Sequence, residues 1–299
     1  MMNFFKLLEY IKRKESSLIL YSLLDRIPII IFGKNPDKIN DFLIGLSELI
    51  DFRKEIVFYT DFISNEEYYS LVQNEDIDYN TQRIQIRCPS DVGLKAINQF
   101  ENFRSWLIGI TIPKQNEKFK NIKNQIRNKI GTYLNILINS DKISVEFEGI
   151  NPKILDLSLE QDILQKISQD TEKSIIRMKR VLSDRIKLNN IDEDLIQTLL
   201  DFNAEKNELK KNIFKKEIQN FYAGSKRAFF ILSRLNLLNN LEIKTKIGSK
   251  TLLETIDFEN VSIERIISFI KHEWGENYIN VIENNKKIFI VDKIDSLWG

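Results

Sequence analysis

The chain has 299 residues, of which 42% are hydrophobic and 29% are charged. These values are typical of a folded globular protein and argue against a largely disordered chain. The 44 Lys and Arg residues nearly balance the 43 Asp and Glu residues, so the composition does not indicate a strongly cationic domain for nucleic acid or membrane surfaces. With one His and one Cys, a metal site rich in these residues and an intrachain disulfide are both excluded.

The amino-terminal sequence predicts a protein that is not exported. Charged residues occur from Lys6 onward, where a secretory signal needs an uninterrupted apolar region. The most apolar stretch, residues 18–32, contains Asp25, Arg26 and Pro28, which make it unsuitable for crossing a membrane. We therefore expect a cytoplasmic protein without membrane insertion.

Residues 1–155 alternate apolar runs with amphipathic stretches, a pattern typical of strands joined by helices. The predicted strands are 27–32, 56–59, 84–88, 106–112 and 143–147. The predicted helices are 3–24, 36–50, 64–73, 90–103 and 116–138. We expect a Rossmann-like, three-layer α/β domain with a mainly parallel five-stranded sheet. The first, second and fourth strands should be central because they are apolar throughout, and the alternating third and fifth strands should be marginal.

Residues 156–299 show a different pattern, because apolar residues recur at helical spacing from Ser158 onward. The predicted helices are 158–186, 192–202, 205–222, 225–238 and 262–274. A strand is predicted at 241–246, and a hairpin is predicted to pair 278–282 with 287–291. We therefore expect a second domain, a helical region that ends in a winged-helix-like module.

The pair Gly33-Lys34 lies between a predicted strand and a predicted helix, where a phosphate loop would sit. The sequence is not a P-loop, because Pro28 stands where the motif has its first glycine and Asn35 where it has Ser or Thr. Open α/β sheets nevertheless bind ligands at the carboxyl ends of their strands. On that rule the ligand-binding candidates are Gly33, Lys34, Asn35, Asp61, Ser90, Asp91 and Lys114.

No set of residues in the sequence is typical of a catalytic, metal or cofactor site, and we predict none of these. Cys88 lies on the apolar side of its predicted strand without a His partner, so we interpret it as a packing residue. Ser90 is interpreted as the N-cap of the next helix. His272, near the end of the predicted helix 262–274, is interpreted as a capping or packing residue.

Two predicted helical stretches are rich in basic residues. Residues 173–187 hold six basic side chains and one acidic residue, a pattern typical of a solvated or partner-facing helix. Residues 206–227 hold seven basic and two acidic residues, and if the tail is a winged helix their cations would contact phosphates. The candidates for contact with nucleic acid or a protein partner are Lys210, Lys211, Lys215, Lys216, Lys226, Arg227, Lys286 and Lys287.

The absence of catalytic signatures favours a non-catalytic cytoplasmic adaptor or regulatory protein that acts through protein–protein interaction. Two alternatives stay open. One is a regulator that binds nucleic acid through its C-terminal module, and the other is an atypical nucleotide- or anion-binding protein that uses Gly33 and Lys34. The first interpretation requires a protein partner, and all three are compatible with a homo-oligomer.

Overall fold

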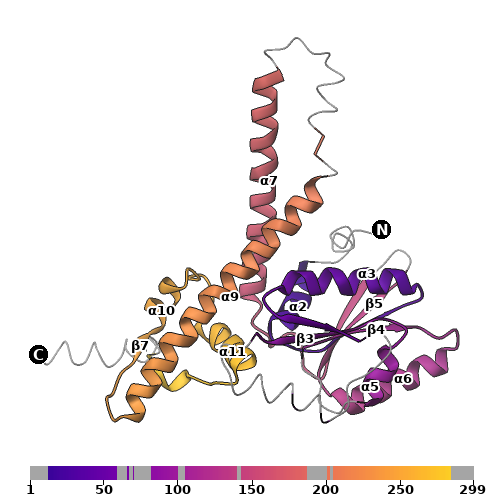
Figure 1. Ribbon diagram of the computed structural model, residues 1–299, viewed down its shortest axis with the longest axis horizontal. Coiled ribbons are helices and arrows are strands. Elements are labelled where there is room, and N and C mark those ends of the chain that lie inside the picture. Colours follow the sequence, from indigo (N-terminus) through magenta and orange to yellow (C-terminus); the bar gives the residue numbers. More distant parts are fainter. Residues whose placement is uncertain are drawn as a thin grey trace, which may run out of the picture.

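The computed structural model describes residues 13–58, 66, 70, 82–99, 105–139, 143–186, 201–202 and 205–283. The helices are α2 (Arg13–Leu24), α3 (Pro36–Ser47), α5 (Gly93–Gln99), α6 (Asn116–Ile130), α7 (Ser158–Ile186), α9 (Glu205–Asn240), α10 (Ser249–Thr255) and α11 (Ile263–Trp274). The strands are β1 (Ile29–Gly33), β2 (Lys54–Val57), β3 (Ile84–Cys88), β4 (Trp106–Thr111), β5 (Tyr133–Ile138), β6 (Ile143–Glu148), β7 (Ile247–Gly248) and β8 (Ile282–Glu283). Figure 1 shows an α/β body from which the long helices α7 and α9 extend.

Six strands form one sheet in the order β2-β3-β4-β1-β5-β6. Neighbouring strands are parallel except β5 and β6, which pair antiparallel. The mixed α/β fold with a mostly parallel sheet is therefore confirmed. The number of strands is not, because the sheet contains one strand more than the five that the sequence predicted.

The additional strand is β5, which occupies residues predicted to end the helix 116–138. Instead, α6 ends at Ile130, because Gly131 has a φ of 75° and its N–H bonds to the Arg127 carbonyl oxygen. Glycine adopts this conformation without a Cβ penalty, so it terminates helices readily. The apolar run that follows is almost entirely buried between β1 and β6.

The positions of two strands also differ from the prediction. β1 and β4 are central as expected, but β2 lies at the edge and β3 lies inside the sheet. The chain passes over β4 and β3 on its way from β1 to β2, and no local sequence pattern reveals such a crossing. As a result Arg83, Gln85 and Arg87, the polar positions of the third segment, are buried instead of facing solvent.

Helices cover both faces of the sheet, so the body has three layers (Figure 1). Ile31 packs on the face covered by α2 and α3, and Phe32 packs on the face covered by α5 and α6. A glycine sets the close approach of α3. A Cβ at Gly109 in β4 would lie only 2.7 Å from Cγ2 of Ile39 in α3.

The long helices agree with the sequence in one case and differ in the other. α7 spans Ser158–Ile186, as predicted. α9 is one helix over Glu205–Asn240, where two helices were predicted. Gly224 lies inside this continuous helix. A Cβ at this position would lie 2.9 Å from the Ile256 carbonyl oxygen, so the glycine permits close packing. None of the described helices combines the length and the apolar character needed to span a lipid bilayer.

The C-terminal elements fit the prediction in part. α11 follows Ser262, whose side chain accepts a hydrogen bond from the Arg265 N–H. The strand predicted at 241–246 is wrong, because the extended residues are Ile247–Gly248, which pair in parallel with β8. The second arm of the predicted hairpin lies outside the described residues, which therefore do not establish a winged helix. Also outside them lie the beginning of the predicted helix 3–24 and most of the predicted helices 64–73 and 192–202.

One hydrophobic core joins the two halves of the chain. Leu24 and Ile31 from the first half belong to the same buried cluster as Phe221 and Phe269 from the second. The division into domains 1–155 and 156–299 stays a prediction.

Candidate functional site

The strand-end candidates lie along one edge of the sheet, which we call the carboxyl edge. Gly33 ends β1 and Lys34 follows it, and Lys114 follows the neighbouring strand β4. The Gly33 carbonyl oxygen accepts a hydrogen bond of 2.8 Å from the Ile112 N–H. The chain leaves β1 toward β2 and leaves β4 toward β5, in opposite directions along the sheet. This is the switch point at which open α/β sheets bind ligands.

The loop after β1 is nevertheless too short to cradle a phosphate. Only Lys34 and Asn35 separate β1 from α3, whereas a phosphate loop needs several glycine-rich residues. The Asn35 side chain accepts a hydrogen bond of 3.1 Å from the Lys38 N–H, and Asp37 places a carboxylate in the first turn. The chain therefore already occupies the helix terminus that would attract an anion.

The candidates after β3 do not extend this edge into a reactive site. α5 begins at Gly93, so the prediction that Ser90 caps this helix is wrong. The Ser90 N–H instead donates a hydrogen bond of 3.0 Å to Oδ1 of Asn40, and the Ser90 hydroxyl is buried without a hydrogen-bond partner. Asp91 is exposed, and Asp61 lies outside the described residues.

Cys88 is fully buried in the core between the sheet and the α5–α6 layer. Burial raises the pKa of its thiol, which keeps the group protonated and unreactive. The position agrees with the packing role that the sequence indicated.

The opposite edge of the sheet, which we call the amino edge, holds most of the buried charge. Asp25, Arg53 and Arg83 precede β1, β2 and β3, and Ser105 precedes β4. The amino ends of parallel strands meet at one edge, so these residues lie along a single side of the sheet. α11 packs over them and supplies further charged groups.

Arg265 of α11 lies between two buried carboxylates. Its Nη1 is 2.8 Å from Oδ1 of Asp25, and its Nη2 is 2.6 Å from Oε1 of Glu160. Nδ1 of His272 lies 3.2 Å from the other Asp25 oxygen. Burial alone would raise the pKa of Asp25, but Arg265 and His272 outweigh burial and lower it. Burial raises the pKa of Glu160, and Arg265 offsets this only in part.

Arg53 forms a second buried pair with α11. Its Nη2 lies 2.6 Å from Oε2 of Glu273, and both side chains are 0% exposed. The same guanidinium donates hydrogen bonds to the Leu23 and Leu24 carbonyl oxygens at 2.7 and 2.8 Å. Arg53 therefore ties the end of α2 to the end of α11.

These contacts bury most of the α11 surface and leave few of its side chains free to bind a ligand. Arg265 and Glu273 point into the protein, and most other α11 side chains are also buried. The exposed α11 positions include Glu264, Lys271 and His272, which do not make a cationic face. α11 in this position cannot enter a nucleic-acid groove.

Several α9 cations that the sequence predicted to contact a partner already interact with other side chains of this chain. Lys211 pairs with Glu48 at 2.5 Å, and Arg227 pairs with Asp257 at 3.5 Å. Lys226 lies over the Phe230 ring. Lys210 and Lys215 are half-buried, Lys216 is exposed, and Lys286 and Lys287 lie outside the described residues.

A more coherent surface lies on α7, whose outer end extends beyond the body (Figure 1). Positions 173, 177 and 180 follow helical spacing along one exposed row, with two aliphatic side chains on its flanks. We call this surface the α7 outer face; it consists of Lys173, Ile176, Arg177, Arg180 and Val181. Ile176 is 64% exposed and Val181 is 51% exposed.

Within the part of the chain that the structure describes, no three His, Cys, Asp or Glu side chains are grouped to hold a metal ion. No protein-family model matches the chain, and searches of curated proteins and of solved structures likewise find no significant match.

Sequence reasoning missed the amino edge. A usable signal was present, because charged residues stand immediately before three predicted strands: Asp25 and Arg26, then Arg53, then Arg83. Charges in these positions look like ordinary loop residues when the packing of α11 is unknown. Arg265, the partner of Asp25, and Glu273, the partner of Arg53, come from the distant helix α11, and no local pattern relates them to the strands.

Proposed function

We propose that this protein is a non-catalytic cytoplasmic adaptor or regulatory protein that binds a protein partner through the α7 outer face. In this proposal residues 1–155 are a Rossmann-like platform, and residues 156–299 carry the binding elements. The order of α9, β7, α10, α11 and β8 supports a winged-helix-like module at the end of the chain, used here for internal packing.

The carrying observation is that the α7 outer face combines cations with exposed aliphatic side chains. Arg177 and Arg180 have no ion-pair partner among the described residues, whereas Lys173 pairs with Asp170 at 3.4 Å. Exposed aliphatic side chains beside cations are typical of a surface that a protein covers. The complementary partner presents carboxylates flanked by apolar side chains.

Nucleic acid is the second candidate, because the same arginines suit phosphate groups. Ile176 and Val181 favour the protein partner, since a phosphate backbone gives aliphatic side chains nothing to pack against. The burial of α11 also removes the element that would read bases.

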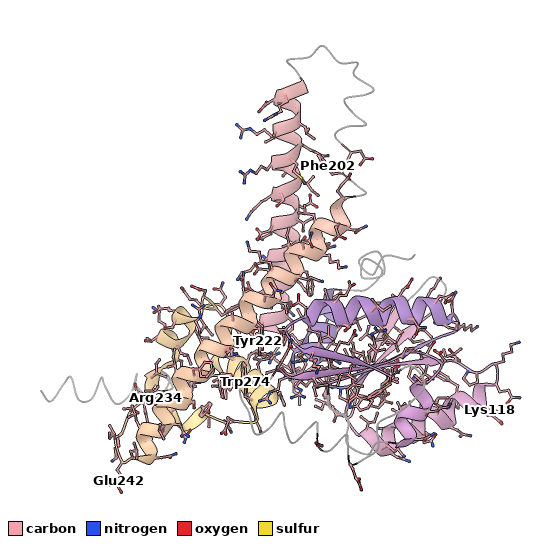
Figure 2. The ribbon with its side chains drawn as sticks, viewed as in Figure 1. Lys118, Phe202, Tyr222, Arg234, Glu242 and Trp274 are labelled. Atoms are coloured by element: carbon pink, nitrogen blue, oxygen red, sulfur yellow. The ribbon has the colours of Figure 1, made fainter. Side chains whose placement is uncertain are left out.

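The test compares copurification of the full chain with that of two charge-reversal variants from the source cells. Arg177→Glu with Arg180→Glu changes the α7 outer face. Lys118→Glu with Lys120→Glu makes the same charge change on α6, far from α7 (Figure 2). We expect a stoichiometric protein partner with the unchanged chain and the α6 variant, and its loss with the α7 variant.

Two outcomes would contradict this function. One is a partner that all three chains retain equally. The other is an absorbance excess near 260 nm that copurifies with the chain and disappears in the α7 variant, because it would identify nucleic acid as the ligand of this face.

A further inference from the structure

Among the described residues four arginines are buried, and one of them differs from the others. Arg53, Arg87 and Arg265 each contact at least one carboxylate, on Glu273, on Glu55, and on Asp25 and Glu160 respectively. Arg83 is 1% exposed, yet none of its three guanidinium nitrogens has a hydrogen-bond partner in the described part of the chain.

An unpaired buried guanidinium is chemically unusual. Arginine keeps its proton in proteins, so Arg83 cannot relieve the cost of burial by becoming neutral as a lysine can. An isolated buried charge costs several kcal/mol unless a counter-charge compensates it. Most buried polar groups are satisfied, and an exception in a folded protein calls for an explanation such as a bound ion.

The surroundings of Arg83 place it at the junction of the sheet with α9 and α11. The Arg83 carbonyl oxygen accepts a hydrogen bond of 2.7 Å from the Lys54 N–H. Two residues before Lys54, the Phe52 ring stacks on the Tyr222 ring of α9 with centroids 4.2 Å apart. The Tyr222 ring in turn lies 5.7 Å from the Trp274 ring of α11, and Figure 2 shows these two residues together between the body and the C-terminal elements.

The charged groups of this junction act on Tyr222. Burial raises the pKa of Tyr222 to about 12, Glu273 adds to the rise, and Arg53 and Arg83 oppose it. All three charged groups therefore act on the Tyr222 hydroxyl. Tyr222 is only half-buried, so part of this residue is accessible to solvent beside the buried charges.

We propose that the amino edge of the sheet binds one small oxyanion between Arg83 and Tyr222. Arg53 and Glu273 neutralise each other at 2.6 Å, which leaves the Arg83 charge to be balanced by one anionic group. The guanidinium fork matches two oxygens of a phosphate or carboxylate better than it matches a monatomic ion. The ligand links β3 to α9 and α11, so its binding stabilises the packing of the C-terminal helices on the sheet.

The test measures thermal unfolding and calorimetric binding with the full chain, titrated with inorganic phosphate or acetate at ionic strength held constant with chloride. A ligand that binds only the folded state raises the unfolding temperature, by roughly 5 °C at a hundredfold excess over Kd. We expect this rise with at least one of the two oxyanions. Phosphate as the stronger ligand identifies a phosphoryl group, and acetate as the stronger ligand identifies a carboxylate.

The variants locate the site. Arg83→Met keeps an unbranched apolar side chain without the charged guanidinium and should lose at least tenfold in affinity. Lys34→Met removes one cation from the carboxyl edge and should bind as the unchanged chain does. Tyr222→Phe removes only a hydroxyl and should weaken binding severalfold, so it tests the site even if Arg83→Met does not fold.

Three results would overturn the proposal. One is the absence of any response to either oxyanion in the unchanged chain. Another is an equal response in the unchanged chain, Arg83→Met and Tyr222→Phe. The third is a strongly destabilised Arg83→Met with no oxyanion response in the unchanged chain, because a carboxylate of the chain itself would then be the partner of Arg83.

Discussion

The two edges of the parallel sheet carry their charge in opposite ways. At the carboxyl edge Lys34 and Lys114 are exposed, and the helix terminus beside them is already capped. At the amino edge Arg53, Arg83 and Arg265 are buried, and α9 and α11 pack against them. The rule that open sheets bind ligands at their carboxyl ends thus selects the edge with exposed lysines and not the edge with buried arginines. Fold class alone therefore does not predict at which edge of this sheet the buried charge lies.

The largest effect on stability is expected from the buried charges of the amino edge. We expect Arg265→Met to lower the free energy of unfolding by about 3–5 kcal/mol, because it leaves Asp25 and Glu160 buried without their cation. Urea denaturation measures this loss. The exposed Arg234 on α9 (Figure 2) provides the control, and Arg234→Met should change stability by no more than about 0.5 kcal/mol. Equal small losses in both variants would show that the buried cluster does not hold α11 in place.

Lowering the pH should reduce the stability that Asp25 contributes at the amino edge. The folded-state pKa of Asp25 lies below its ordinary value of 3.8, so its stabilising contribution is present above about pH 4 and is lost as the pH falls below it. We expect Asp25→Asn to lose stability less steeply than the unchanged chain between about pH 4 and 2. Glu160 has the opposite sign, because its pKa is raised.

The control for this pH dependence is Asp91→Asn, which removes an exposed carboxylate at the carboxyl edge. Its stability should follow the slope of the unchanged chain in urea titrations at each pH. If Asp25→Asn has that same slope as well, the pairing of Asp25 with Arg265 and His272 does not contribute to acid stability.

At the carboxyl edge we expect a smaller effect, which comes from helix capping alone. Asn35→Ala should lower the free energy of unfolding by about 1 kcal/mol, because it removes the acceptor of the Lys38 N–H. Asn35→Ser keeps an acceptor and should retain most of the stability. Equilibrium unfolding in urea compares the two variants, and a loss of several kcal/mol in both would mean that Asn35 has a role beyond the cap.

The smallest effect is expected for Lys34→Ala. This exposed side chain has no described ion-pair partner, so its removal should change stability by no more than about 0.5 kcal/mol. Calorimetric titration should also show unchanged phosphate binding. A loss of phosphate binding in Lys34→Ala would restore the carboxyl edge as the ligand site.

The sequence predicted those features that depend on neighbouring residues. The strands at β1, β3, β4 and β6, the helix α7 and the Ser262 cap of α11 all follow from local periodicity and capping. It failed at β5, although Gly131 carried a helix-stop signal that was available. It also failed at Gly224, where close packing against Ile256 explains a glycine inside a helix.

The two candidate sites also differ in how far they depend on neighbouring residues. The carboxyl-edge residues could be placed from sequence because strand ends are local features. The amino edge could not, because the charged partners of Asp25 and Arg53 lie more than two hundred residues away, on α11. Burial of Arg83 also depends on the position of β3 inside the sheet, which the crossing from β1 to β2 determines.

Hydrogen–deuterium exchange of the full chain with and without saturating inorganic phosphate tests most directly which edge binds. Bound ligand should slow amide exchange where it links structural elements. We predict added protection in peptides that cover residues 52–55, 82–86 and 270–275, and unchanged exchange across residues 33–40. Protection confined to residues 33–40 and 112–116 would contradict it and place the ligand at the carboxyl edge.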